Sequence, residues 1–316
     1  MSGHRGVIVA LGGNAIIKEG ERGTVPQQFE HTLATMRFVA SMIEAGEQRL
    51  VVTHGNGPQM GSMMLRSELA TSVLPPLPMA TCVADLQGGM GYMIQQTLVK
   101  ALGERGLSRT VTTVVTQVEI DPEDPGFQKP TKPIGRFMTE AEAKTAASER
   151  GWLVGADSNR GWRRMVASPR PRRVVELEAV RALLDAGVVP VAVGGGGIPV
   201  LRRAEGVYEG VDAVIDKDLA SALLGAELGA RLLVILTGVD EVQIGYGKPH
   251  ARALRETNIA EMKRHIAAGE FAPGSMLPKV EAAVLFLERG GGEVIITSPE
   301  RCLEGLRGER GTRVRA

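Results

Sequence analysis

The chain has 316 residues, 43% hydrophobic and 23% charged, a composition typical of a globular enzyme with one large domain or two lobes sharing a sheet. A net charge of +1 and an aromatic content of 3% argue against nucleic acid as a partner, because no overall positive field attracts it and few rings could stack on bases. The two cysteines lie far apart, so we expect no structural zinc. We expect no signal peptide, and no apolar run reaches the roughly 18 residues of a membrane span, so a cytoplasmic protein is predicted.

The first strand is predicted at Val7–Leu11, where five consecutive apolar residues indicate a strand buried on both faces. It ends at Gly12 and Gly13, which lack Cβ atoms and let the backbone turn tightly near a ligand, and Asn14 follows. A helix that starts after such a turn points free backbone N–H groups at an anion. Taken alone, the pattern fits an ordinary strand-to-helix turn equally well.

Helices and strands are then expected to alternate along the chain. We predict a helix from Pro26 to Ile43, a strand at 49–53, a helix at about 59–70, a helix opened by 85–91 that reaches Leu102, and a strand at 110–118. Beyond residue 171 we predict a helix at 176–186, a strand at 188–193, a helix at 219–228, a strand at 232–236, a helix from 274 to 288 and a last strand at 293–297. This alternation predicts a mostly parallel sheet covered by helices on both faces.

Glycine-rich segments follow four of the predicted strands, beginning at Gly12, His54, Gly194 and Thr237. Because ligands of parallel sheets bind beyond the carboxyl ends of the strands, we expect these segments to meet at one site. Glycine turns combined with lysines suit phosphoryl transfer, in which catalysis is mainly positioning and charge neutralisation. His54 itself is interpreted as a structural histidine, and a catalytic acid or base is the alternative.

Residues 121–171 differ from the rest of the chain, because prolines and arginines cluster there together with both tryptophans, Trp152 and Trp162. We interpret this stretch as a small subdomain standing off the main sheet; a surface excursion without function is the alternative. Lys132 lies between Pro130 and Pro133, which restrict the backbone. A backbone restricted in this way suits a lysine whose side chain reaches into a binding site from a fixed position.

Two other lysines are candidates for contact with phosphate groups. Lys217 lies between Asp216 and Asp218 after a buried stretch, although a surface ion pair at a helix start is the alternative. Lys279 lies near the start of a predicted helix, where a cation opposes the helix dipole. A bound nucleotide phosphate would explain a lysine at that position.

In chain order, these segments resemble the carbamate kinases of the amino acid kinase family. The resemblance is carried by residues 10–15 (ALGGNA), 54–59 (HGNGPQ), 130–135 (PTKPIG), 161–163 (GWR), 194–199 (GGGGIP), 214–218 (VIDKD), 236–240 (LTGVD) and 271–279 (FAPGSMLPK), and it covers nearly the whole chain. It implies an α/β fold, a three-layer α/β/α sandwich with a mostly parallel central sheet and a small protruding subdomain. It also implies a homodimer that catalyses ATP + carbamate ⇌ ADP + carbamoyl phosphate with Mg²⁺, forming ATP in the catabolism of arginine or other sources of carbamoyl phosphate.

The resemblance also implies roles for single residues. The catalytic residues would be Lys132, Lys217, Asp218 and Lys279, with Asp218 organising the lysines. The carbamoyl phosphate site would include Gly12, Gly13, Asn14, Gly55, Asn56, Gly57, Gly195 and Gly196. The ATP or ADP site would include Lys217, Thr237, Gly238, Val239, Asp240, Tyr246, Met276, Pro278 and Lys279, and no residue is implied as a metal ligand. One domain would span 1–316, with a carbamoyl phosphate lobe at about 1–205 carrying the subdomain at about 121–171, and a nucleotide lobe at about 206–316.

One position separates this chain from other amino acid kinases. Many relatives, such as acetylglutamate kinase, carry a lysine two residues before the Gly-Gly pair, where this chain has Ala10. We expect Lys132 to supply the missing charge. Two alternatives stay open: a kinase of another small acid, and a non-catalytic nucleotide or metabolite sensor, which would have no need of charges placed for a transition state.

Overall fold

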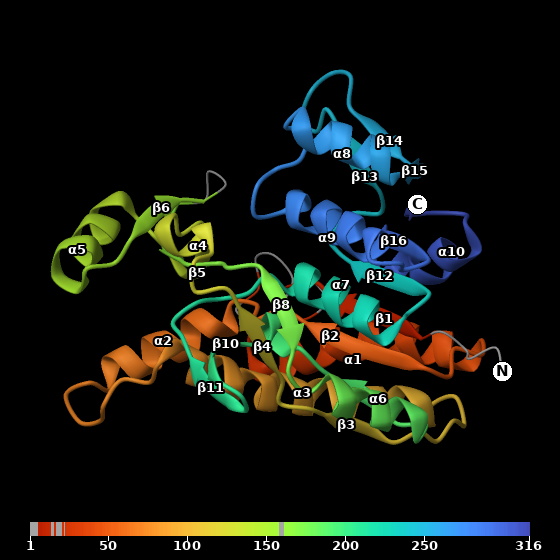
Figure 1. Ribbon diagram of the computed structural model, residues 1–316, viewed down its shortest axis with the longest axis horizontal. Helices are drawn as coiled ribbons and strands as arrows, with labels where there is room; N and C mark the ends of the chain where they lie inside the picture. The colour runs from red at the N-terminus through yellow and green to blue at the C-terminus, as the bar shows by residue number, and fades with distance from the viewer. Residues whose placement is uncertain (1–5, 14–15, 17–20, 22, 158–160) are drawn as a thin grey trace.

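The computed structural model describes residues 6–13, 16, 21, 23–157 and 161–316. Its centre is an eight-stranded sheet in the order β15-β17-β16-β12-β1-β2-β9-β3 (Figure 1). These strands are β1 (Val7–Leu11), β2 (Leu50–His54), β3 (Val111–Thr113), β9 (Val189–Val191), β12 (Leu232–Leu236), β15 (Glu256–Asn258), β16 (Glu293–Thr297) and β17 (Thr312–Arg315). Neighbours run parallel except β16 and β17, so the predicted mostly parallel sheet is confirmed.

Helices cover both faces of this sheet, and β1 shows why. Its odd-numbered residues join a buried cluster with α1 (Val25–Glu44), α3 (Met79–Gly103) and α10 (Cys302–Arg307). Ile8 and Ala10 join a second cluster with α6 (Leu177–Asp185), α7 (Lys217–Leu228), α8 (Ile259–Ala267) and α9 (Met276–Glu288). Because successive side chains of a strand point to opposite faces, a continuous apolar run fills both clusters. The three-layer α/β/α sandwich is therefore confirmed.

Two smaller sheets lie beside the main one. A four-stranded sheet in the order β11-β10-β4-β8 is formed by β4 (Gln117–Ile120), β8 (Pro171–Val174), β10 (Ile198–Ala204) and β11 (Val207–Gly210). A hairpin of β13 (Val242–Ile244) and β14 (Arg252–Leu254) precedes β15 and α8. Helix α2 (Gln59–Leu69) connects the end of β2 to the segment before α3.

The protruding subdomain has a sheet of its own. After the short α4 (Pro125–Gln128), strands β5 (Lys132–Met138), β6 (Val154–Ala156) and β7 (Trp162–Val166) pair in the order β5-β7-β6. Helix α5 (Glu140–Arg150) packs on this sheet through a small apolar cluster that includes Trp152 and Trp162. Figure 1 shows α5 and β6 standing clear of the main sheet, as predicted for the subdomain.

Three predicted elements are wrong in their bounds or number. The strand expected at 110–118 is two strands in different sheets, since the Gln87 amide binds the Thr116 backbone where the chain leaves β3. Helix α3 begins at Met79, directly after Pro78, rather than near 85. The strand at 293–297 is not the last, because β17 follows it; only Thr312 and Val314 of β17 are buried, which is too short an apolar pattern to read from sequence.

The four glycine-rich segments meet as expected. Strands β12, β1, β2 and β9 are consecutive neighbours and all parallel, so their carboxyl ends lie side by side along one edge of the sheet. Each strand is followed directly by one of the segments. Among the described residues, no helix has the length and apolarity needed to cross a bilayer.

Candidate active site

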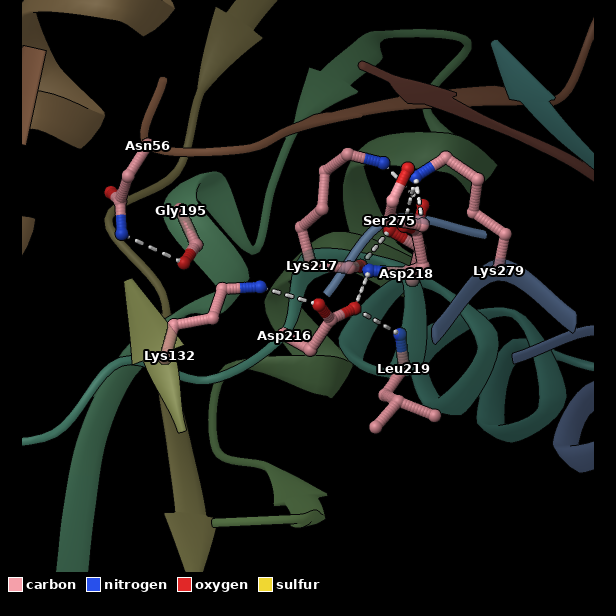
Figure 2. A network of polar contacts seen from close by, with 10 residues as sticks. Asn56, Lys132, Gly195, Asp216, Lys217, Asp218, Leu219, Ser275 and Lys279 are labelled. Atoms are coloured by element: carbon pink, nitrogen blue, oxygen red, sulfur yellow. Dashed lines mark hydrogen bonds and ion pairs between the residues drawn. The ribbon is translucent and has the colours of Figure 1, made fainter. Parts of the chain in front are cut away.

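Two lysines share one buried carboxylate at this edge. Lys217 is the first residue of α7 and its ammonium contacts Asp218 Oδ1. Lys279, from the first turn of α9, places Nζ 3.4 Å from Asp218 Oδ2 and donates to the Ser275 carbonyl at 3.0 Å. The Asp218 side chain is only 3% exposed. The carboxylate therefore holds two ammonium groups from different helices beside each other, as Figure 2 shows.

The third lysine, Lys132, belongs to the subdomain. Lys132 is the first residue of β5, and its Nζ donates to Asp216 Oδ2 at 2.7 Å. The other oxygen of Asp216 caps α7, accepting from the backbone N–H of Asp218 at 2.9 Å and of Leu219 at 3.4 Å. Asp216 was absent from the predicted site, although its place next to Lys217 in the Asp-Lys-Asp motif was a usable signal. The structure thus brings all four predicted catalytic residues into one network.

The electrostatics of this network favour a bound anion. Burial lowers the pKa of the Lys217 ammonium, and Asp218 only partly opposes this effect. Burial alone would raise the pKa of the Asp216 carboxyl, but Lys132, Lys217 and Lys279 together hold that pKa well below its ordinary value. Three ammonium groups facing two carboxylates leave one positive charge unmatched. A phosphoryl group carries the opposite charge.

The glycines after β1 and β2 leave space for different neighbours. A Cβ on Gly12 would lie 2.5 Å from the Leu236 carbonyl oxygen, so this glycine lets β1 and β12 end side by side. A Cβ on Gly55 would lie 3.1 Å from Cδ of Lys217, so Gly55 leaves room for the lysine stem. A Cβ on Gly13 would meet nothing within 4 Å. Asn14, predicted beside it, lies outside the described residues.

The third segment is held by side chains from two other elements. Gly195 has φ +68°, and Asn56 donates from Nδ2 to its carbonyl at 3.2 Å. A Cβ on Gly195 would lie 2.1 Å from Asn56 Oδ1, and one on Gly196 would lie 2.3 Å from the Ile215 carbonyl oxygen. Gln87, which is 1% exposed, donates to the Gly194 carbonyl at 2.9 Å. Sequence reasoning missed Gln87, whose only signal is an amide on the buried face of an apolar helix.

His54, at the end of β2, is neutral at pH 7. Its Nδ1 lies 2.9 Å from the Gly55 carbonyl oxygen, which fixes the proton on Nδ1. Burial lowers the pKa of the imidazole to about 4. His54 therefore adds no positive charge to the lysine network, in line with a structural role.

Residues predicted for the nucleotide follow β12 and begin α9. Thr237, Gly238 and Val239 directly continue β12, and Asp240 accepts from Ser298 Oγ at 2.6 Å. Met276 and Pro278 lie half-buried in the same helical turn as Lys279. Gly57, predicted for the other substrate, has φ +55° just before α2. Tyr246 is 73% exposed in the turn after β13, and no described contact joins it to the lysines.

A pocket of about 720 Å³ lies elsewhere, between α2 and the subdomain. Its walls include Met64 and Glu68 of α2, Ile134 of β5, and Trp152. None of the three lysines lines it. The candidate active site is therefore the lysine network, where charges from three elements converge.

The molecule is therefore an α/β/α protein with a cluster of three lysines and two aspartates at the carboxyl edge of its sheet. A sequence model described as the amino acid kinase family matches residues 5–298, and the chain belongs to that family. It is 50% identical over 311 residues to the carbamate kinase-like protein YahI of Escherichia coli, with 98% of each chain covered. It is 44% identical over 310 residues to the carbamate kinase of Thermococcus kodakarensis, again with 98% of each chain covered.

Solved structures of carbamate kinases are also similar to this chain. The carbamate kinase of Giardia lamblia bound to AMP-PNP aligns with a TM-score of 0.90 and 40% identity, covering 100% of this chain and 99% of that chain. An N-acetylglutamate synthase from Neisseria gonorrhoeae aligns with a TM-score of 0.58 at 16% identity, a likeness of fold alone.

Proposed function

We propose that this protein is a carbamate kinase, which transfers a phosphoryl group reversibly between carbamoyl phosphate and ADP. The observation that carries the proposal is the convergence of Lys132, Lys217 and Lys279 on two buried aspartates at the carboxyl edge of the sheet. Full-length relatives named carbamate kinase support the choice of substrate. The alternative of a pure sensor finds little support in a network of this kind, which is suited to charge that develops during reaction.

In the direction of ATP formation, an oxygen of the ADP β-phosphate attacks the phosphorus of carbamoyl phosphate. The bond between phosphorus and the carbamate oxygen breaks, and carbamate leaves with the electron pair. Lys217 and Lys132 would neutralise oxygens of the moving phosphoryl group, and Lys279 the nucleotide side. Because these ammonium groups are already in place, little reorganisation is needed as the charge shifts.

The residues at the site fit Mg²⁺ only as a partner of the nucleotide. No group of three acidic, histidine or cysteine side chains forms a metal cage within the described ranges. Asp216 and Asp218 each already bind an ammonium group. Mg²⁺ commonly keeps several waters and binds through substrate phosphates. When bound, it would supply further neutralisation of phosphate charge.

The homodimer is part of the same proposal. Strand β3 ends the main sheet, and next to it Tyr92, Val99 and Val115 are 58%, 49% and 52% exposed. An unpaired edge flanked by apolar side chains favours contact with a second copy. Sedimentation at several protein concentrations tests whether the protein forms a dimer, and a monomer at every concentration would contradict the proposal.

The cytoplasmic location and the place in arginine catabolism stay predictions.

The direct test is ATP formation from ADP and carbamoyl phosphate by the purified protein with Mg²⁺. Acetyl phosphate and other acyl phosphates serve as competing donors, because one relative is named only carbamate kinase-like. We expect carbamoyl phosphate to give the highest kcat/KM. Preference for another acyl phosphate would support the small-acid kinase alternative, and tight ADP binding without turnover would support the sensor.

A further inference from the structure

The two carboxylate oxygens of Asp216 make contacts with different parts of the protein. Oδ1 caps α7 through the N–H groups of Asp218 and Leu219. Oδ2 faces the opposite way and accepts from Lys132 Nζ at 2.7 Å (Figure 2). The cap lies within the main body of the protein, whereas Lys132 belongs to the subdomain. Asp216 therefore links the start of α7 to the subdomain.

Lys132 is the third ammonium group of this network, and like charges repel one another. Lys217 and Lys279 already occupy both oxygens of Asp218, so Asp216 supplies the carboxylate for the third ammonium. A lysine side chain is a flexible stem with considerable rotamer entropy, which placement next to like charges does not restrain. The Lys132 side chain is 26% exposed and its ammonium has three donors. Pairing with Asp216 thus leaves donors for a ligand.

We propose that Asp216 is a positioning residue that docks the subdomain and holds Lys132 at the phosphoryl site. The proposal rests on the proposed phosphoryl transfer and names the group that places the subdomain's lysine for it. Without the Asp216 charge, Lys132 and the start of β5 would move away from Lys217 and Lys279. Catalysis would then need a rare conformation, so kcat would fall while ADP affinity changes little.

The test is Asp216→Asn, because asparagine keeps a cap oxygen for α7 but removes the charge that holds Lys132. Asp216→Ser keeps the cap with a shorter side chain and serves as a second variant if Asn folds poorly. The control is Asp185→Asn, which removes a 2.7 Å ion pair with Arg49 at the opposite, amino edge of the sheet. We expect Asp216→Asn to lower kcat about tenfold, and Asp185→Asn to leave it unchanged.

A double-mutant cycle separates positioning from a merely structural role. If Asp216 acts through Lys132, then Asp216→Asn combined with Lys132→Ala should be no slower than Lys132→Ala alone. A wild-type kcat in both Asp216→Asn and Asp216→Ser, or losses that multiply in the double variant, would overturn the proposal.

A second readout does not depend on activity. Labelling of Lys132 by an amine-reactive reagent, measured by mass spectrometry, should be faster in Asp216→Asn than in the unaltered protein. Lys129, an exposed residue of the same subdomain, is the internal standard. Unchanged labelling would refute the docking role. Absence of ATP formation by the unaltered protein would instead refute the proposed function, leaving the labelling result to decide on docking.

Discussion

At the scale of single residues, charge and space are arranged around Lys217. Asp218 binds its ammonium and Gly55 leaves room for its stem. Burial lowers the pKa of this ammonium, so the group depends on its carboxylate partner. A buried, pre-placed cation is effective in stabilising a moving phosphoryl group because it needs no reorganisation.

Replacing Lys217 therefore tests the charge directly. We expect Lys217→Ala to lower kcat at least about a hundredfold, the usual loss for one pre-placed donor, while the fold is kept. Steady-state kinetics of ATP formation give kcat, and circular dichroism confirms folding. A kcat equal to that of the unaltered protein would remove Lys217 from the mechanism.

His54 makes stability depend on pH. Burial lowers its pKa from 6.5 to about 4, so between these values the unfolded chain takes up a proton that the folded protein does not. The free energy of unfolding should fall as pH drops from about 6.5 to about 4, by on the order of 3 kcal/mol from this group. Denaturant titrations of the protein and of His54→Asn should show a weaker pH dependence in the variant. Identical slopes would show that His54 is not the group responsible.

At the scale of elements, α2 and β5 touch through two glycines. A Cβ on Gly61 of α2 would lie 2.1 Å from Cα of Gly135 in β5. Since β5 begins with Lys132, the contact sets how closely the lysine's strand approaches the main body. A side chain at this contact would push the strand outward.

The corresponding test is Gly61→Ala. We expect about a tenfold or greater loss of kcat, because a displacement of about 1 Å at a catalytic group is costly. Gly88→Ala in α3 is the matched control, since a Cβ there meets nothing within 4 Å. That change should leave kcat unaltered and add up to about 1 kcal/mol of stability. Equal kcat values for the two variants would argue against the contact as a determinant of Lys132 placement.

The sequence predicted those elements whose signals are local. Each glycine-rich segment follows a continuous apolar strand, so the sheet edge could be inferred without knowing the strand order. Strand β17 buries only Thr312 and Val314, and the break between β3 and β4 depends on Gln87, which is distant in sequence. Pairing of Lys132 with Asp216 joins residues 84 positions apart, beyond the reach of any local pattern.

At the scale of the whole molecule, the proposed catalytic residue Lys132 lies on the protruding subdomain. The subdomain has its own sheet and apolar cluster, yet its first strand carries Lys132 to the edge of the main sheet. This arrangement allows the subdomain to close on a ligand while its interior stays intact. Strand β1 has Ala10 where many relatives carry a lysine, and Lys132 brings a third ammonium group to the network.

Both tryptophans are placed where a closure of the subdomain would change their surroundings. Trp152 and Trp162 pack in the subdomain cluster, and Trp152 lines the pocket facing α2. We expect tryptophan emission to change when ADP, Mg²⁺ and a carbamoyl phosphate analogue bind together. Each tryptophan replaced singly by phenylalanine identifies the source of the signal. Constant emission at saturating ligand in all three proteins would contradict closure.

The most direct test of the proposed active site is the kcat of Lys132→Ala in ATP formation from ADP and carbamoyl phosphate. Lys129→Ala, an exposed lysine three residues before Lys132, is the control. We expect Lys132→Ala to lower kcat at least about a hundredfold, with a smaller change in KM for ADP, and Lys129→Ala to keep near-native kinetics. A near-native kcat for Lys132→Ala would show that the subdomain takes no part in the active site.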